Sequence, residues 1–379
     1  MRSWRRLLIA GLVELGRRAR ANQLGLKWYF DQIDPIQIIP YRGYGTAELI
    51  HLRGRVVEDK GITRHAVARS GWRNLGDMYR RFDSHEIGGA RLRAHFAGQQ
   101  LETVADNNGY FAFRLLPSPS DTVLQDWHLV PLELVAPKVP DQGSVLATGQ
   151  VLIPDPDAAF GVISDIDDTI IRTGVTDLLT MGRIVLLNSA QTRVPFPGVA
   201  AFYHALRNGL PGAGPNPLFY VSNSPWNLYD LLEEFIQIHG FPPGPLLLQT
   251  WGRSRALLAG TSLPKLKRDR VQLLFDLYPT LSFILIGDSG EHDPEIYRDL
   301  ARAHPGRVSA IYIRHVHSRA RAGEIAAIAA DLATLGVPLL LARDTILPAE
   351  HAAEQGFIDP ETLPYIRANV THDFLSALD

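Results

Sequence analysis

Apolar residues in the second half of the chain form short continuous runs that are separated by stretches with helical spacing. Three of these runs are FGVISD at 160–165, PLFYVS at 217–222 and LSFILIGD at 281–288. Runs of this length that alternate with helices indicate a parallel sheet. From residue 160 onward we expect strands at 160–165, 218–222, 245–250, 282–287, 308–313 and 337–342, and helical segments at 175–209, 226–239, 266–277, 293–303, 319–334 and in the tail.

The first half of the chain instead alternates apolar and polar residues in several short segments. The strand-like segments are TAELIHLRGRVVED, ARLRAHFAG, QQLETVADN, GYFAFRL, WHLVPLELVAP and SVLATGQVLIP. DNNG at 106–109 is a hairpin turn signal, because Asn and Gly readily supply the positive φ that such turns need. Short strands with turns and no βαβ pattern predict a β-sandwich-like domain.

One basic segment, residues 59–89, has the pattern of a partly helical insertion in this β region. Its arginines either form a solvated face or meet acidic lipid headgroups: Arg64, Arg69, Arg73, Arg80 and Arg81. The proline-containing linker IPDPDAAF precedes the first buried run and marks a domain boundary. We therefore expect an N-terminal amphipathic helical segment at 1–35, a β-sandwich-like accessory domain at 36–153 and an α/β domain at 154–379.

The bulk composition is that of an ordinary globular protein. A chain of 379 residues is long enough for two domains, and 46% hydrophobic with 21% charged residues argues against disorder. The net charge of −2 argues against a generic nucleic-acid binder. Without cysteine there is no disulfide framework, thiolate metal site or cysteine nucleophile.

The N-terminal stretch MRSWRRLLIAGLVELGRRARANQ has an apolar face with arginines largely outside it. This pattern suits a helix on an anionic membrane, and equally a helix docked on the protein's own surface. Glu14 interrupts the apolar centre, which argues against a signal peptide. No apolar run approaches the length that crosses a bilayer, so we expect a cytoplasmic protein, with peripheral membrane contact left open.

Polar side chains follow three of the predicted strands at their ends. Asp165, Asp167, Asp168 and Thr169 follow the first strand, Ser222 and Asn223 the second, and Asp288 and Asp293 a later one. Lys265 and Lys267 lie near the start of the helical pattern that precedes the last of these strands. Taken alone, each group is compatible with a solvated turn. Because the carboxyl ends of parallel strands share one crevice, the groups together predict a site for a divalent cation and a phosphate.

This order resembles the four-part signature of the haloacid dehalogenase superfamily: Asp-x-Asp-x-Thr, a strand-end Ser, a Lys, and Gly-Asp with a second Asp shortly after it. The strings DIDDTI, YVSNSPWNLYDLL and ILIGDSGEHDPEIY resemble the actin-patch-type phosphatidate phosphatase family. The resemblance covers roughly residues 155–345, with weaker likeness at YRGYGT, residues 41–46. It implies a Rossmann-like parallel sheet of haloacid dehalogenase type. The short segments 174–217 and 224–264 lead us to expect little or no cap and an open site.

Phosphoryl transfer needs a nucleophile, a cation and an acid, and the expected roles follow from these needs and the resemblance. Asp165 is the expected nucleophile, forming an aspartyl-phosphate. Mg²⁺ is expected between Asp165, the backbone carbonyl of Asp167 and Asp288, with Asp293 orienting the metal site. The Asp167 side chain is expected to act first as acid and then as base, and Thr169 to fix Asp167 or cap a helix.

The remaining expected groups bind the phosphoryl oxygens. Ser222 and the backbone amide of Asn223 lie where a strand meets a helix, which is a natural cradle for these oxygens. Lys267 is the preferred cation, and Lys265 is its competitor. Arg314, which follows the predicted strand at 308–313, is a further candidate for binding the phosphate.

Three hypotheses of function follow. The first, implied by the resemblance, is a Mg²⁺-dependent phosphatase that converts phosphatidate to diacylglycerol and phosphate. Its partner would be a lipid phosphate ester, and peripheral contact with an anionic membrane is left open. The second keeps the chemistry but replaces the lipid by a phosphoprotein or a soluble phosphomonoester. The third is a membrane-binding scaffold without catalysis. The sequence leaves the oligomeric state open.

Overall fold

The structure is a computed structural model that describes residues 35–59, 86–117, 126–166, 197–249, 263–315 and 319–376. The predicted N-terminal helical segment, and nearly all of the basic insertion, lie outside the described residues. So do residues 167–196 and 250–262, which include parts of the two segments considered for a cap, 174–217 and 224–264. The expectation of little or no cap therefore stays a prediction.

The described residues of the N-terminal part form eight mostly antiparallel strands. They are β1 (Ile36–Pro40), β2 (Gly43–Gly45), β3 (Ile50–Glu58), β4 (Arg91–Phe96), β5 (Gln99–Val104), β6 (Tyr110–Leu115), β7 (Trp127–Ala136) and β8 (Leu146–Leu152). Alternate residues of these strands face one buried cluster, as in β6, where Phe111, Phe113 and Leu115 point inward. The period-2 patterning thus forms β3 to β8 where the sequence predicts strands, whereas β1 and β2 were not predicted.

These strands form one hydrogen-bonded sheet, in the order β1-β3-β2-β8-β7-β4-β5 with β6 on β3, rather than the two separate sheets of a sandwich. The reason is the length of β3, which pairs with β1 and β2 along one edge and with β6 along the other. The DNNG segment does form a turn, with Gly109 at φ 73°. It connects β5 and β6, which pair with β4 and β3, so the expected hairpin ladder does not form.

The C-terminal part is a six-stranded, all-parallel sheet in the order β11-β10-β9-β12-β13-β14. Its strands are β9 (Gly161–Asp165), β10 (Leu218–Pro225), β11 (Leu246–Gln249), β12 (Phe283–Asp288), β13 (Val308–Arg314) and β14 (Leu339–Ala342). The chain runs outward from β9 through β10 to β11, then returns to β12 on the other side of β9 and runs outward again. Strand order therefore reverses beside β9, and a crevice opens at the strands' carboxyl ends at such a point.

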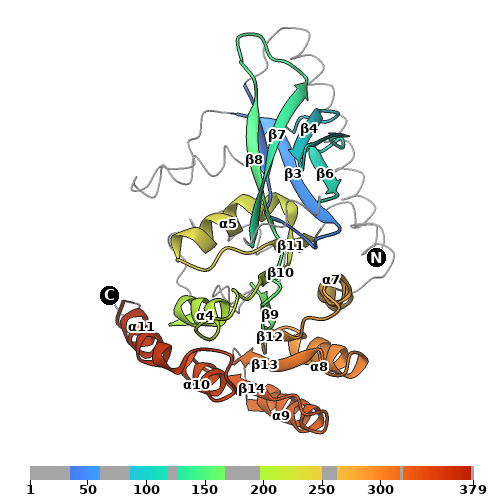
Figure 1. The fold of residues 1–379 in the computed structure, drawn as a ribbon. Coiled ribbons are helices and arrows are strands. Elements are labelled where there is room, and N and C mark those ends of the chain that lie inside the picture. Colours follow the sequence, from blue (N-terminus) through green and yellow to red (C-terminus); the bar gives the residue numbers. More distant parts are fainter. Residues whose placement is uncertain are drawn as a thin grey trace, which may run out of the picture.

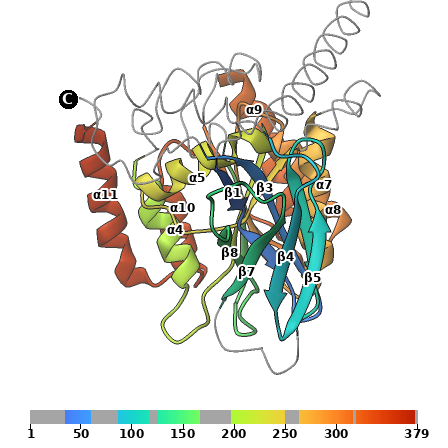
Figure 2. The ribbon, with the colours of Figure 1, turned by 90° about the horizontal axis from the view of Figure 1, so that it is seen from above.

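Helices cover both faces of this sheet, which explains its continuous apolar runs. They are α4 (Val199–Asn208), η3 (Trp226–Leu228), α5 (Tyr229–Ile238), α7 (Leu263–Leu277), α8 (Asp293–Ala303), α9 (Arg319–Ala333), α10 (Ile346–Glu354), η5 (Pro360–Thr362) and α11 (Leu363–Ser376). One buried cluster joins α4, α5, α10 and α11 to the sheet, and another joins α7, α8 and α9 to it. In Figure 2 the two groups of helices lie on opposite sides. The predicted parallel α/β arrangement is thus confirmed, with small differences at the ends of elements.

The antiparallel sheet packs on the α/β part near β10, β11 and α5 (Figure 1). The two parts share apolar clusters: Tyr41 packs with the cluster of α4 and α5, and Leu152 with that of α7 and α8. The link between β8 and β9, residues 153–160, contains the predicted domain boundary. Among the described helices, none is both long and apolar enough to cross a bilayer.

Asn216 fixes the entry to β9. Its side chain is fully buried, accepts hydrogen bonds from the backbone N–H groups of Ala159 and Phe160, and donates one to the carbonyl of Leu206. The link before β9 is therefore held to α4 by a single amide side chain.

We predict that Asn216→Ala lowers the free energy of unfolding by about 2–4 kcal/mol, because buried backbone groups lose their partners. Chemical denaturation measures this change. Asn208→Ala, at an exposed position of α4, is the matched control and should change stability by less than about 1 kcal/mol. Equal effects of the two substitutions would contradict the assignment.

Candidate active site

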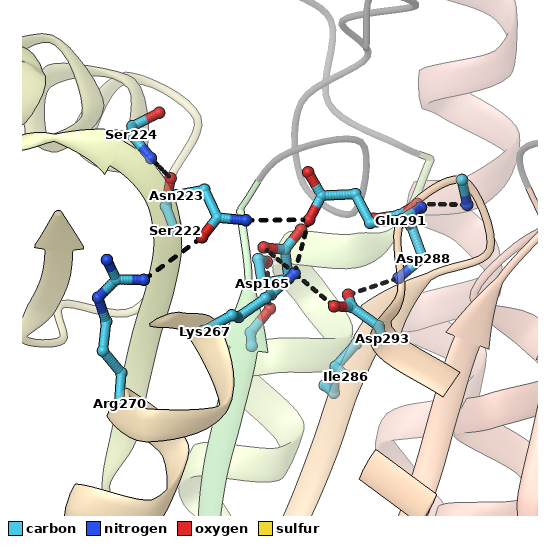
Figure 3. Close-up of polar contacts among 12 residues, drawn as sticks. Asp165, Ser222, Asn223, Ser224, Lys267, Arg270, Ile286, Asp288, Glu291 and Asp293 are labelled. Carbon is cyan, nitrogen blue, oxygen red and sulfur yellow. Dashed lines mark hydrogen bonds and ion pairs between the residues drawn. The ribbon is translucent and has the colours of Figure 1, made fainter. Parts of the chain in front are cut away.

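Three neighbouring strands bring the predicted site residues to one edge of the parallel sheet. Asp165 ends β9 and pairs in register with Val221, so Ser222 lies one residue beyond it on β10. Asp288 ends β12, on the other side of β9. Asp165, Ser222 and Asp288 are each 0% exposed. The crevice expected at the strand ends therefore gathers these three groups (Figure 3).

Carboxylates and one ammonium form the centre of this site. Oxygen atoms of Asp165, Asp288 and Asp293 all lie within 4.8 Å of one another. Lys267, in the first turns of α7, places Nζ 2.7 Å from Asp165 Oδ1 and also pairs with Asp293. Its side chain is 1% exposed, and Figure 3 shows it reaching between the two aspartates. Lys265, by contrast, is 62% exposed and pairs with Asp269.

Burial sets the protonation of these groups. Burial, with the nearby Asp293 carboxylate, raises the pKa of Asp288 from its ordinary value of 3.8 to about 8. Burial likewise raises the pKa of Asp293. Burial alone would lower the pKa of Lys267, but the carboxylates of Asp165, Asp293 and Glu291 hold it well above its usual range. Lys267 is therefore charged. Its single positive charge is not enough for all of the buried carboxylates around it to ionise together easily.

The oxygens present fit a hard divalent cation. Asp288 Oδ1 accepts hydrogen bonds from the N–H groups of Gly290 (2.6 Å) and Glu291 (2.9 Å). Its Oδ2 is buried and, among the described residues, accepts no hydrogen bond. Gly287 leaves room for the Asp293 carboxylate, which a Cβ at residue 287 would strike. Buried carboxylate oxygens in excess of ammonium groups are the ligands that Mg²⁺ prefers.

Asn223 connects the end of β10 to the loop after β12 and to α7. Its Nδ2 donates to Glu291 Oε2 and its Oδ1 accepts from Arg270 of α7, each at 3.4 Å. The Ser222 hydroxyl accepts from the N–H of Ser224 at 2.9 Å. These contacts hold the strand end on which the phosphoryl cradle is predicted.

Arg314 pairs in register with Asp288 at the end of β13 and is 9% exposed. It lines a small, partly open cavity, with Tyr203 of α4 and Thr345 before α10 among the other lining residues. The structure thus places the backbone of Arg314 next to that of Asp288, while its side chain lines this cavity. Asp167, Asp168 and Thr169 lie outside the described residues, and their roles stay predictions.

Two further residues support the site, and the sequence analysis did not single them out. Glu291 joins Lys267 (3.1 Å) to Asn223. Arg321 of α9 donates to the carbonyls of Ser289 (3.1 Å) and Glu291 (3.0 Å) and pairs with Glu295 at 2.6 Å. Glu291 lies within the GDSGEHD string, whereas no sequence signal connects Arg321 to a loop about thirty residues earlier.

Comparison with known proteins gives a match for this part of the chain. Residues 160–315 match the family model described as the catalytic domain of phosphatidate phosphatase APP1. All of the site residues placed above except Arg321 lie in this range. Phosphatidate phosphatase APP1 of Saccharomyces cerevisiae is 40% identical over 156 residues, which are 41% of this chain and 26% of that protein.

An uncharacterized protein of Schizosaccharomyces pombe is 32% identical over 163 residues, 42% of this chain and 26% of that protein. The aligned part is thus about a quarter of the length of either relative. A solved structure of a carbohydrate acetylesterase from Xanthomonas citri covers 71% of this chain and 66% of that one at 12% identity, with a TM-score of 0.25. A likeness of that size supports no inference about fold or function.

We predict that Asp288→Asn raises Tm by about 2 °C or more in chelator, because it removes a carboxylate that is buried at a cost. The gain should be larger at about pH 8 than at about pH 6. A folded-state pKa above the ordinary value means that the unliganded protein loses stability as pH rises from about 4 toward about 8.

We also predict that Mg²⁺ raises Tm in the parent protein and that the same substitution abolishes this rise. Asp299→Asn, on the surface of α8, is the control and should leave that rise intact. A full Mg²⁺ response in Asp288→Asn would contradict the metal site.

We predict that Arg321→Ala raises the Mg²⁺ concentration needed for the half-maximal rise in Tm roughly tenfold, because the loop that orients Asp288 loses its anchor. Thermal unfolding across a Mg²⁺ titration measures it. Arg298→Ala is a suitable control, since Arg298 is 29% exposed, against 21% for Arg321, and bonds only locally to Asp299 in the contacts described. Equal shifts for both variants would contradict a role for Arg321.

Proposed function

We propose that this protein is a Mg²⁺-dependent phosphatase that uses Asp165 as its nucleophile. The observation that carries the proposal is the cluster of buried Asp165, Asp288 and Asp293 carboxylates around Lys267, within the segment that matches a phosphatase catalytic domain. Burying several carboxylates together costs desolvation free energy, and clusters of this kind are typical of functional sites.

In the proposed reaction an Asp165 oxygen attacks phosphorus in line with the ester oxygen, the P–O bond to the leaving group breaks, and phosphate passes to the carboxylate. Asp167 donates a proton to the leaving alkoxide and then takes one from the water that hydrolyses the aspartyl-phosphate. Lys267, Ser222 and the amide of Asn223 stabilise the phosphoryl oxygens. A bound Mg²⁺ supplies further charge neutralisation of these oxygens.

For the substrate we propose phosphatidate, which would yield diacylglycerol and inorganic phosphate. The support is the 40% identity over 156 residues to a relative named phosphatidate phosphatase, together with the family match at residues 160–315, which contain Asp165, Asp288 and Asp293. A soluble phosphomonoester or a phosphoprotein would use the same chemistry and is the alternative that the test separates.

We predict that purified protein releases phosphate from phosphatidate-containing vesicles with Mg²⁺ and not with a chelator. Asp165→Asn should lower this rate by about a thousandfold or more, since the nucleophile is lost. Asp157→Asn, exposed in the link before β9, is the control and should retain the parent rate.

Phosphate release from soluble esters but not from vesicles would reject the lipid and keep the mechanism. An Asp165→Asn variant with the parent rate on every substrate would reject catalysis at this site.

A further inference from the structure

The antiparallel sheet lies outside the matched catalytic segment, yet it contacts the stretch that follows the phosphoryl-binding strand end. We propose that Tyr41 and Arg42 of this sheet are positioning residues for Ser222 and Asn223. The antiparallel sheet would thus help to set the geometry of the active site. This inference rests on the proposed phosphatase function and concerns the geometry of the same site.

The contact begins three residues after Asn223. The Tyr41 ring stacks on Trp226 of η3, with centroids 5.1 Å apart and planes at 6°, and on Tyr229 of α5, at 3.9 Å and 26°. Tyr41 is 3% exposed and Tyr229 4%. Trp226 and Tyr229, which follow Ser222 and Asn223 in the chain, are therefore packed against the antiparallel sheet.

Arg42 adds two polar contacts to this stack. Its backbone N–H donates to the Tyr229 hydroxyl at 2.7 Å, and its guanidinium pairs with Glu233 one turn along α5. Both side chains of the ion pair are 14% exposed. At this exposure the pair is largely shielded from solvent and fixes the orientation of α5 relative to the sheet.

Tyr41 and Arg42 are themselves rigidly held. They link β1 to β2, and the N–H of Tyr41 donates to the carbonyl of Arg53 on β3 at 2.8 Å. The next residue, Gly43, lies so close to the carbonyl of His51 that a Cβ there would collide with it. The guanidinium of Arg53 also lies 5.9 Å from the centre of the Trp226 ring. Because so many contacts restrain this corner of the sheet, it can hold Trp226 and Tyr229 in fixed positions.

Two sets of contacts thus restrain the end of β10. Asn223 is held by Arg270 and Glu291. The chain from Pro225 into η3 is held by the contact of Trp226 with Tyr41. Because displacement of a binding group by about 1 Å costs up to about a hundredfold in rate, this second restraint bears on catalysis as well as on stability.

The test compares two ion pairs of nearly equal burial that both join the parts. Arg42→Ala removes the Glu233 pair beside the cradle. Arg207→Ala removes the pair with Asp126, whose side chains are 15% and 17% exposed. Arg207 lies in the last turn of α4, which leads to the amino end of β10, away from Ser222. The readouts on the full chain are kcat and KM, the inhibition constant of inorganic phosphate, Tm, and hydrogen exchange of residues 222–229.

We expect Arg42→Ala to weaken phosphate inhibition and lower kcat/KM roughly ten- to a hundredfold, with faster exchange at residues 222–229. Arg42→Lys keeps the charge and should recover most of the activity. Tyr229→Phe keeps the ring stack but loses the hydroxyl, and should show a smaller effect in the same direction. Arg207→Ala should lower Tm comparably and leave the kinetics and the exchange at 222–229 unchanged.

Equal kinetic effects of Arg42→Ala and Arg207→Ala, or unchanged exchange at residues 222–229 in Arg42→Ala, would overturn the inference. Failure of the parent protein to release phosphate would instead reject the proposed function. The exchange comparison still tests the contact in that case, since it needs no substrate.

Discussion

The arrangement of the α/β part depends on the ion pairs of Lys267. Its ammonium group is buried between the carboxylates of Asp165 and Asp293. Three separate elements contribute to it: the end of β9, the start of α7 and the start of α8. Removing one partner from such a buried cluster leaves an uncompensated charge, at a cost of several kcal/mol. The cluster therefore specifies how these elements meet at the edge of the sheet, and the excess of carboxylate over ammonium creates the demand for a further cation.

Three supporting contacts restrain the residues around this centre. Arg321 of α9 holds the loop after β12 by its carbonyls, Glu291 connects that loop to Asn223, and the corner of the antiparallel sheet packs on the residues after β10. Each support comes from an element far away in the sequence. A site assembled in this way holds its buried polar groups in fixed positions, which is the condition for strong electrostatic stabilisation of developing charge.

Much of the α/β part follows from local patterns. The runs FGVISD and LSFILIGD predict buried strands, and each ends in an aspartate that reaches the same crevice, because parallel strands share their carboxyl edge. The N-terminal part shows the limit of this reasoning. Its strands are visible as alternation, but their partners depend on β3, which pairs along both edges and joins all eight strands into one sheet. Pairing between distant strands leaves no mark on the sequence of either one.

The sequence by itself determined the alternation of strands and helices, the acidic strand ends and the presence of two lysines near them. Only the tertiary structure decided between those lysines: Lys267 points into the cluster while Lys265, two residues earlier on the same helix, faces solvent. Only it revealed the contacts of Arg321 with the loop after β12, and those of the corner at Tyr41 and Arg42 with the residues after β10. The physical reason is that periodicity records which face of an element is buried, whereas the group that meets a given charge is set by packing between elements distant along the chain.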